Sequence, residues 1–227
     1  MSKGKFSENE LITRSYPATF RAVEDTESER GIIEGTPIVF NQDAVIQDWA
    51  GQFVERIDPN ALNGADMKDV CLFVNHETRK IPVARSKNGN PNSTMGFTID
   101  SEGVHMRASL DVENNAEARA LHSAIKRGDM DGMSFMFRIK DQEWLNIDSD
   151  MPIRIVKSIS IVHEVSVVNY PAYPQTSVSA RSSEETEYSP LEEARKAYAE
   201  ETAGRRIDAV EVEKLKNINI IRMIREG

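Results

Sequence analysis

Three side chains in this sequence are of the types that together hydrolyse amide bonds: a serine, a histidine and a carboxylate. Ser134 lies in the segment Gly132-Met-Ser-Phe-Met-Phe137, where a glycine-punctuated turn gives way to an apolar, aromatic run. A serine hydroxyl becomes a nucleophile when a base accepts its proton, and the base works best when a third group fixes its tautomer. A serine beside a strand is more often a turn residue, so the interpretation depends on both partners.

His76 is the candidate base among the 4 histidines. It stands where the short apolar run Val70–Val74 ends, a pattern typical of a buried strand. The alternative is an ordinary histidine at a strand end, and the sequence alone leaves that open. His105 alternates outward on a predicted hairpin, and His122 lies on the polar side of a predicted helix. Both are therefore predicted to be surface residues.

Glu164 is the candidate third residue, on an argument from strand register. If a turn centred on Ser149 joins two antiparallel strands, Ser134 faces Glu164, because the two are equally far from that turn. Directly opposed residues share one face of a sheet. His163 then points to the other face, but a slip of one residue exchanges the two. Glu164 is the prediction and His163 the alternative.

The surrounding segments predict an α+β fold with a mainly antiparallel β core. Residues 97–110 alternate around a turn and predict a hairpin, and residues 153–168 predict a long strand rich in β-branched side chains. One interior helix is predicted just before Ser134. Asn114 or Asn115 caps its start, and Gly128 closes it.

Composition divides the chain into four parts. Residues 1–30 are a polar lead-in, with one edge strand predicted from Tyr16 to Val23, and residues 31–180 form the β-rich domain. Residues 181–189 are a polar linker. Residues 190–227 are a helical C-terminal extension: the capping box Ser189-Pro-Leu-Glu192 begins a helix that should stop near Gly204, and a second amphipathic segment follows.

Charge and composition argue against several other classes of protein. A net charge of −9 argues against a nucleic-acid partner. The sequence contains no run of about 18 apolar residues, so no membrane span is predicted. Because Cys71 is the single cysteine, an internal disulfide is excluded, and its place in an apolar run predicts a core thiol. His76 lacks the second histidine of a zinc-protease helix, and no glycine-rich phosphate loop is present. We therefore expect no metal and no cofactor.

Residues 31–181 resemble the tailed-phage prohead proteases, capsid-maturation serine proteases related in fold to herpesvirus assemblin. The resemblance implies a mainly antiparallel β core, forming a closed or nearly closed sheet, with flanking helices. The matching segments occur in the family's order and are Ile33-Glu-Gly35, Phe53–Leu62, Val70–His76, Gly132–Phe137 and Glu164–Pro174.

By this resemblance Ser134 is the nucleophile, His76 the general base and Glu164 the orienting acid. The herpesvirus relatives carry a histidine at the third position, which keeps His163 as the alternative. The expected substrates are the scaffolding region of the major capsid protein and the protease itself, with self-association as a further option. The expected location is the host cytoplasm, inside the immature shell.

The alternative hypothesis is that the protein is a non-catalytic scaffold or capsid-assembly factor. In that case the C-terminal helices are the binding element and the β domain is a spacer. The tail from Arg181 is expected to be either a docking segment or a segment that is removed, because a flexible acidic linker is easily cleaved.

Overall fold

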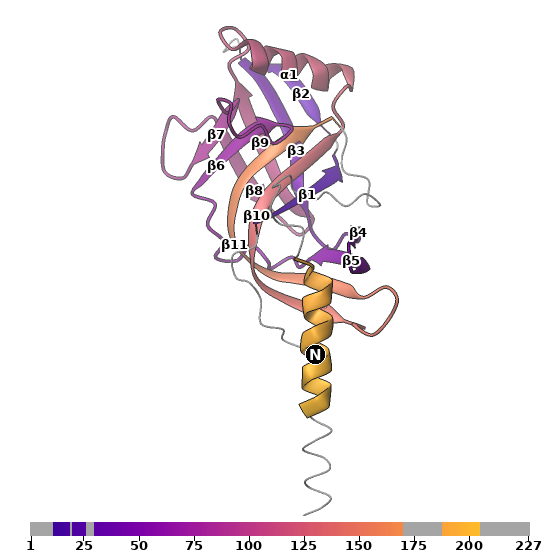
Figure 1. Ribbon diagram of the computed structural model, residues 1–227. Coiled ribbons are helices and arrows are strands. Elements are labelled where there is room, and N and C mark those ends of the chain that lie inside the picture. The colour runs from indigo at the N-terminus through magenta and orange to yellow at the C-terminus, as the bar shows by residue number, and fades with distance from the viewer. Residues whose placement is uncertain (1–10, 19, 26–29, 170–187, 205–227) are drawn as a thin grey trace, which may run out of the picture.

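Strands make up most of the computed structural model, which describes residues 11–18, 20–25, 30–169 and 188–204. They form two sheets that share one hydrophobic core (Figure 1). Two helices occur in the described ranges, one at each end of the molecule as Figure 1 is drawn. The mainly β, α+β class expected from the sequence is therefore confirmed.

The larger sheet has seven strands, and its longest pair runs as two curved ribbons through the molecule (Figure 1). Its neighbours pair antiparallel, except that two strands run parallel to the central one. In spatial order the strands are β1 (Leu11–Pro17), β10 (Gly132–Leu145), β11 (Ile153–Val168), β5 (Gly51–Ile57) and β4 (Ala44–Asp48), while β6 (Asp69–Val74) pairs with both β11 and β7 (Ala84–Lys87).

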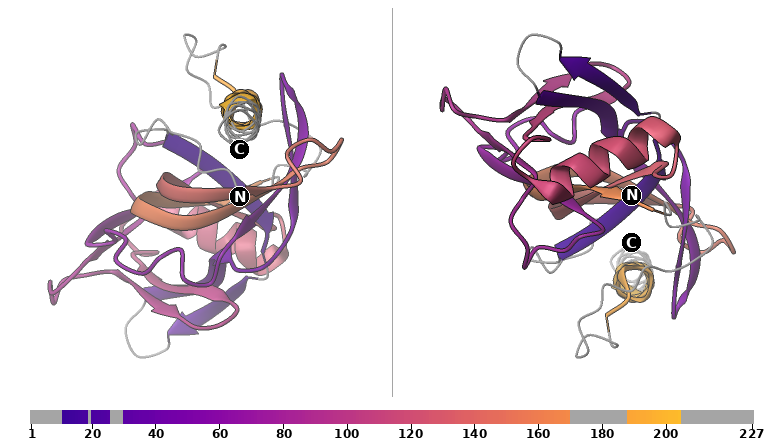
Figure 2. Two further views of the ribbon diagram at one scale, coloured as in Figure 1. Left: turned by 90° about the horizontal axis from the view of Figure 1, so that it is seen from below. Right: turned by 90° about the horizontal axis from the view of Figure 1, so that it is seen from above.

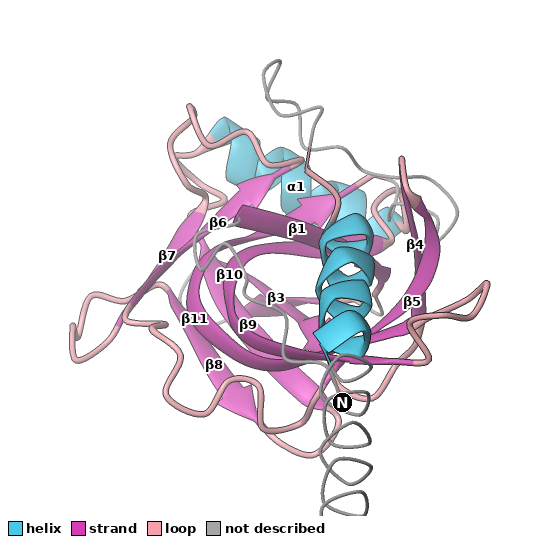
Figure 3. Ribbon diagram, turned by 60° about the horizontal axis from the view of Figure 1, so that its bottom comes forward, coloured by secondary structure: helices cyan, strands magenta, loops and turns pink. Residues whose placement is uncertain are grey.

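The smaller sheet has four antiparallel strands in the order β2 (Arg21–Asp25), β3 (Arg30–Val39), β9 (Gly103–Leu110) and β8 (Met95–Ile99). The hairpin predicted over residues 97–110 is the β8–β9 pair. Figure 3 shows the strands of both sheets curving around a common centre. Among the described strands none of one sheet pairs with one of the other, so the single closed sheet that was expected is not confirmed.

The segment expected as a polar lead-in contributes two strands, where one edge strand was predicted. β1 pairs with β10 in the larger sheet, and β2 pairs with β3 in the smaller one. Pro17 ends β1, since proline has no N–H to donate to a ladder, and Ala18 N then donates to Asp131 O at 2.9 Å. The chain therefore changes sheets within a few residues.

The core lies between the two sheets and is filled by the inward faces of the long strands. Phe135 and Phe137 are fully buried, with ring centroids 4.5 Å apart. Val162, Val165 and Val167 of β11 belong to the same cluster. Burying one such side chain stabilises the fold by about 1.5–3 kcal/mol, so this alternation fixes which face of β10 turns toward the core between the sheets.

Helix α1 (Ala116–Arg127) begins and ends as its sequence predicts. The Asn115 side chain accepts hydrogen bonds from the backbone N–H groups of the first turn, and Gly128 closes the helix at φ 78°. The prediction that His122 lies at the surface was wrong, since only 8% of it is exposed. Gly31 explains this, because a Cβ there would lie 2.7 Å from the His122 ring, so the imidazole packs where glycine has no side chain.

The second helix begins at residue 190, where the predicted capping box places its start, and it continues to residue 204, the last residue of the described range. Ser189 Oγ accepts from Glu192 N at 3.0 Å and donates to Asp48 Oδ2 at 2.7 Å. Leu191 packs in a second apolar cluster with Phe53 and Trp144. The helix thus rests on the β4–β5 side of the larger sheet, well apart from α1 (Figure 2).

Three predicted segments lie outside the described residues: the Tyr170-Pro-Ala-Tyr-Pro174 motif, nearly all of the linker, and the second amphipathic segment of the extension. No helix within the described ranges is long and apolar enough to cross a membrane.

A buried charge cluster joins β1 to the rest of the larger sheet. Glu55 is fully buried, and its carboxylate receives Arg14 Nε at 2.5 Å, Arg14 Nη2 at 2.9 Å and Arg154 Nη1 at 3.1 Å. Arg154 also donates to Gln142. Burial alone would raise the pKa of Glu55, but the charges and hydrogen bonds of the two arginines outweigh it, so its pKa lies below the ordinary value of 4.5.

The Glu55→Gln variant should lose about 3–5 kcal/mol of unfolding free energy at pH 7, because it leaves buried arginine charge without its counter-ion. Since folding lowers the Glu55 pKa, this stabilisation is present above pH 4.5 and is lost as the pH falls through the folded-state pKa. Urea unfolding at pH 7 and at pH 3 should show the two proteins converging in acid. A difference that is the same at both pH values would contradict the assignment.

Candidate active site

His76 is placed by the parallel pairing of β6 with β11. Cys71 lies opposite Glu164 and Val74 opposite Val167, so β6 ends beside the last residues of β11. Asn75 and His76 then adopt left-handed backbone angles, φ 51° and 58°. Such angles are unfavourable for residues other than glycine and are often found at functional sites. They turn the imidazole back toward β11.

The imidazole of His76 meets the carboxylate of Glu164, as the sequence predicted. His76 Nδ1 lies 2.6 Å from Glu164 Oε1. The carboxylate is 3% exposed and the imidazole 24%. Because a carboxylate only accepts hydrogen bonds, Nδ1 carries the proton in the neutral ring, and Nε2 is left as an acceptor. Nε2 is itself buried and has no hydrogen-bond partner in the described part of the chain.

Ser166 contacts both His76 and Glu164. Its hydroxyl donates to Glu164 Oε2 at 2.7 Å and accepts from the backbone N–H of His76 at 3.2 Å. One side chain thus fixes both the second oxygen of the carboxylate and the backbone that carries the imidazole. Ser166 was not predicted from the sequence, although its position two residues after Glu164 on a predicted strand puts both side chains on one face.

Ser134 lies next to this group, but its predicted partner was wrong by two residues. It stands opposite Ser166, and Glu164 stands opposite Met136. Near the turn the predicted register holds, with Leu145 opposite Ile153, but irregularities between Met136 and Gln142 shift it. A shift of two residues preserves the face of each side chain, so Ser134 and Glu164 still lie on the same side.

Ser15, Ser134 and Ser166 form what we call the serine row, three serines opposite one another on β1, β10 and β11. Ser134 is fully buried. Its hydroxyl donates to the carbonyl oxygen of Arg14 at 2.9 Å and accepts from Ser15 Oγ at 2.9 Å. In this arrangement the Ser134 hydroxyl makes its hydrogen bonds with β1 and makes none with His76 Nε2. Neither Arg14 nor Ser15 was singled out in the sequence.

The alternative third residue, His163, points elsewhere. Its Nε2 receives Arg138 Nε at 3.3 Å, and burial and then the charge of Arg138 lower its pKa. Cys71 lies opposite Glu164 and is half-buried, so it is not the core residue that was predicted; burial raises the pKa of its thiol, which argues against an activated thiolate. Of the two residues considered for the third position, only Glu164 contacts His76.

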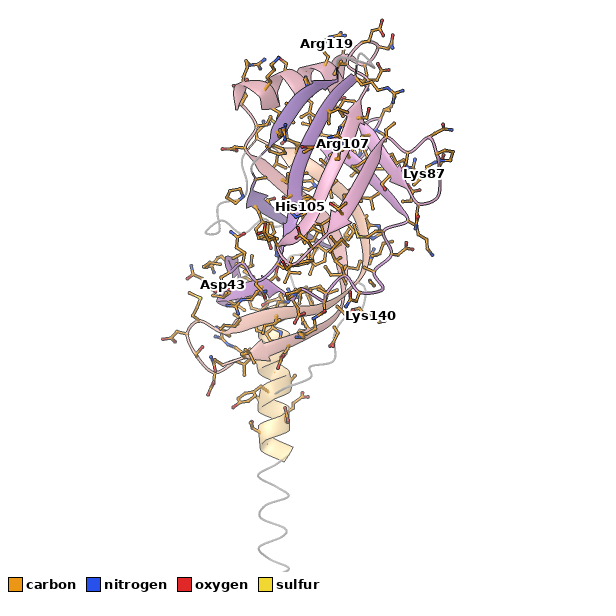
Figure 4. All side chains as sticks on the ribbon, turned by 180° about the vertical axis from the view of Figure 1, so that it is seen from behind. Asp43, Lys87, His105, Arg107, Arg119 and Lys140 are labelled. Carbon is orange, nitrogen blue, oxygen red and sulfur yellow. The ribbon has the colours of Figure 1, made fainter. Side chains whose placement is uncertain are left out.

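The remaining histidine belongs to the smaller sheet. His105 lies 3.1 Å from Thr36 Oγ1 through Nδ1 and 2.8 Å from Asp100 Oδ2 through Nε2. It lines a groove of about 560 Å³ together with Phe97 and Arg107, and Figure 4 shows His105 and Arg107 on this sheet. No residue of the His76 site lines the groove. Among the described side chains, no group of three or more His, Cys, Asp or Glu is arranged to hold a metal ion.

The Ser166→Ala variant should loosen the contact between His76 and Glu164. It removes a hydrogen bond to a charged group, worth about 1.5–3 kcal/mol, and one acceptor for the His76 backbone. We expect the downfield proton resonance of the His76 Nδ1–H group to broaden or disappear in NMR spectra. The control is Ser160→Ala, which removes a hydroxyl that donates to the Arg138 carbonyl of the same sheet. An unchanged resonance in Ser166→Ala would show that the carboxylate is positioned without it.

Comparison with known proteins gives one match. No curated protein and no solved structure matches the chain, but the model of the caudovirus prohead serine protease family matches residues 17–190. The match contains His76, Ser134 and Glu164, and only Pro17 of β1 falls within it. Since it covers well over half of the chain, the protein that brings these residues together belongs to the caudovirus prohead serine protease family.

Proposed function

We propose that the chain is a serine endopeptidase of prohead maturation, with Ser134 as nucleophile, His76 as general base and Glu164 as the group that orients the base. The family supplies the class of reaction, a serine peptidase acting in the assembling phage head. The assignment of the three roles follows the family resemblance, and the contact between His76 and Glu164 supports it.

The observation that carries the proposal is the 2.6 Å contact between His76 Nδ1 and Glu164 Oε1, with Nε2 buried and without a hydrogen-bond partner among the described residues. A carboxylate on Nδ1 fixes the tautomer in which Nε2 accepts a proton, which is the form a general base needs. Within the serine row, Ser134 is the residue next to Ser166, whose hydroxyl touches the His76 backbone.

Ser134 reaches His76 by turning its hydroxyl within the serine row. In the present arrangement the hydroxyl proton is given to the Arg14 carbonyl on β1. Rotation about the Cα–Cβ bond keeps the oxygen on the same face of the sheet and directs it from β1 toward β11. Catalytic hydrogen bonds often form only in the complex with substrate, so this step accompanies substrate binding.

In the proposed reaction the Ser134 oxygen attacks the scissile carbonyl carbon while His76 Nε2 accepts its proton. The tetrahedral intermediate then collapses to an acyl-enzyme, and His76 returns the proton to the leaving amine. Water hydrolyses the acyl-enzyme by the same proton transfers in reverse order. The buried Glu164 stabilises the imidazolium that forms in each half of the cycle.

The proposed substrates are the scaffolding region of the major capsid protein and the protease itself, cut inside the immature shell in the host cell. Membership of a prohead protease family supports a capsid-derived substrate and this place of action. The net charge of −9 suits a protein substrate better than nucleic acid.

The Ser134→Ala variant tests the proposal. Co-expressed with the major capsid protein, it should leave that protein unprocessed, with a fall in kcat on the order of 10⁶-fold in a purified assay. The readout is the mass of the capsid protein. Ser158→Ala is the matched control, because Ser158 is a half-buried serine of β11 outside the stretch that pairs with β6.

If capsid protein is still cut at the same bond with Ser134→Ala, the nucleophile has been assigned wrongly. If neither the wild type nor Ser134→Ala cuts it while both support assembly, the scaffold alternative replaces the protease.

The third role is tested by comparing Glu164→Gln with His163→Gln. Glu164→Gln removes the charge that fixes the Nδ1–H tautomer and should lower kcat by about 10⁴-fold with the substrate KM little changed. His163→Gln removes a ring that contacts Arg138 and should lower kcat far less. A larger loss in His163→Gln would move the acid role to His163. Steady-state kinetics on one peptide substrate gives both values.

A further inference from the structure

β1 lies directly beside Ser134 in the sheet, as an extended polypeptide. All seven of its residues pair antiparallel with β10, and among the described strands it is one of the edge strands of the larger sheet. The carbonyl oxygen of Arg14 accepts a hydrogen bond from Ser134 Oγ, and Ser15 stands directly opposite Ser134. The peptide group between Arg14 and Ser15 therefore lies against the hydroxyl that the proposed function makes the nucleophile.

The side chain of Arg14 is held by hydrogen bonds, in addition to the strand pairing of its backbone. It enters the sheet on the face of Phe135, opposite the serine row, and makes a two-pronged contact with Glu55 at 2.5 and 2.9 Å. The paired carboxylate is fully buried and the Arg14 side chain is 15% exposed. This planar, bidentate geometry selects arginine over lysine.

Glu55 does not depend on Arg14 for neutralisation. Arg154, 1% exposed, pairs with the same carboxylate at 3.1 Å and is fixed in turn by Gln142. When Arg14 leaves, one buried carboxylate and one buried guanidinium remain together. The Glu55 carboxylate can therefore exchange one arginine partner for another without becoming an unpaired buried charge. In an isolated buried ion pair, loss of the arginine would leave the carboxylate unpaired.

We propose that the edge of β10 beside Ser134 is the substrate-strand site of the protease, with β1 as its resident occupant and Glu55 as the residue that selects an arginine in the bound strand. Extended peptides bind sheet edges through main-chain pairing, and pockets for single side chains supply specificity. The substrate class is an extended polypeptide with arginine at the position of Arg14. The inference rests on the proposed function, because it assigns Ser134 as the nucleophile.

The resident strand holds Ser134 in a state that does not react. The Ser134 hydroxyl donates a hydrogen bond to the Arg14 carbonyl and accepts one from the Ser15 hydroxyl. His76 Nε2 has no hydrogen-bond partner in the described chain. A substrate must displace β1, so the measured kcat/KM is scaled by the fraction of molecules in which the edge of β10 is open. Almost all of β1 precedes the family match, which begins at Pro17.

The test is Arg14→Ala in the full chain, assayed on purified major capsid protein. Weakening the resident strand by about 1.4 kcal/mol should raise kcat/KM about tenfold. Arg30→Ala, at an exposed arginine that begins β3, is the matched control and should leave the rate unchanged. Ser15→Ala, which deletes one hydroxyl, should also raise the rate and guards against misfolding of the first variant.

A second arm adds a synthetic peptide with the sequence of residues 11–17 to Arg14→Ala. The peptide should suppress the gained cleavage, and the same peptide with alanine in place of arginine should suppress it at least tenfold less. Cleavage at or below the wild-type rate in both Arg14→Ala and Ser15→Ala overturns the inference, as does equal suppression by the two peptides. If Ser134→Ala fails to abolish cleavage, the proposed function itself has failed.

Discussion

The candidate site depends on the parallel pairing of β6 with β11. His76 and Glu164 are 88 residues apart in the chain, and the register of this pair, with Val74 opposite Val167, brings them to the same level of the sheet. The left-handed turn at Asn75 and His76 then directs the imidazole back over the strand. Because that turn is unfavourable in isolation, it persists only while Asn75 N bonds Val167 O at 2.9 Å and Ser166 holds the next amide.

β11 also carries the other half of the site. Over the stretch that pairs with β6 it pairs on its opposite edge with β10, so Ser166 has Ser134 on one side and the β6 turn on the other. Both edges of the strand are satisfied there, which makes it a rigid support for Glu164 and Ser166. The irregularities of the β10–β11 ladder lie between Met136 and Gln142, and the stretch that contains Ser134 is regular.

The larger sheet has two polar centres on opposite faces, and Arg14 touches both. Its carbonyl meets Ser134 in the serine row, and its guanidinium meets Glu55 on the face of Phe135. Alternation along a strand separates neighbouring side chains, but it leaves the backbone of Arg14 in contact with the serine face. Arg14 therefore contacts both centres, one through its backbone and the other through its side chain.

The sequence determined the local features: the capped helix before Ser134, the β8–β9 hairpin, the helix that starts after Ser189, and the candidates His76, Ser134 and Glu164. The helices and the hairpin depend on short-range periodicity or capping, which neighbouring residues encode, whereas the three candidates came from residue type, an assumed strand register and the family resemblance. Tertiary structure decided the two-sheet arrangement, the register that sets Ser134 opposite Ser166, the burial of His122 over Gly31, and the presence of β1 beside Ser134. Those outcomes depend on pairing between distant strands, where a parallel neighbour, an irregular ladder or a missing side chain leaves no local signal.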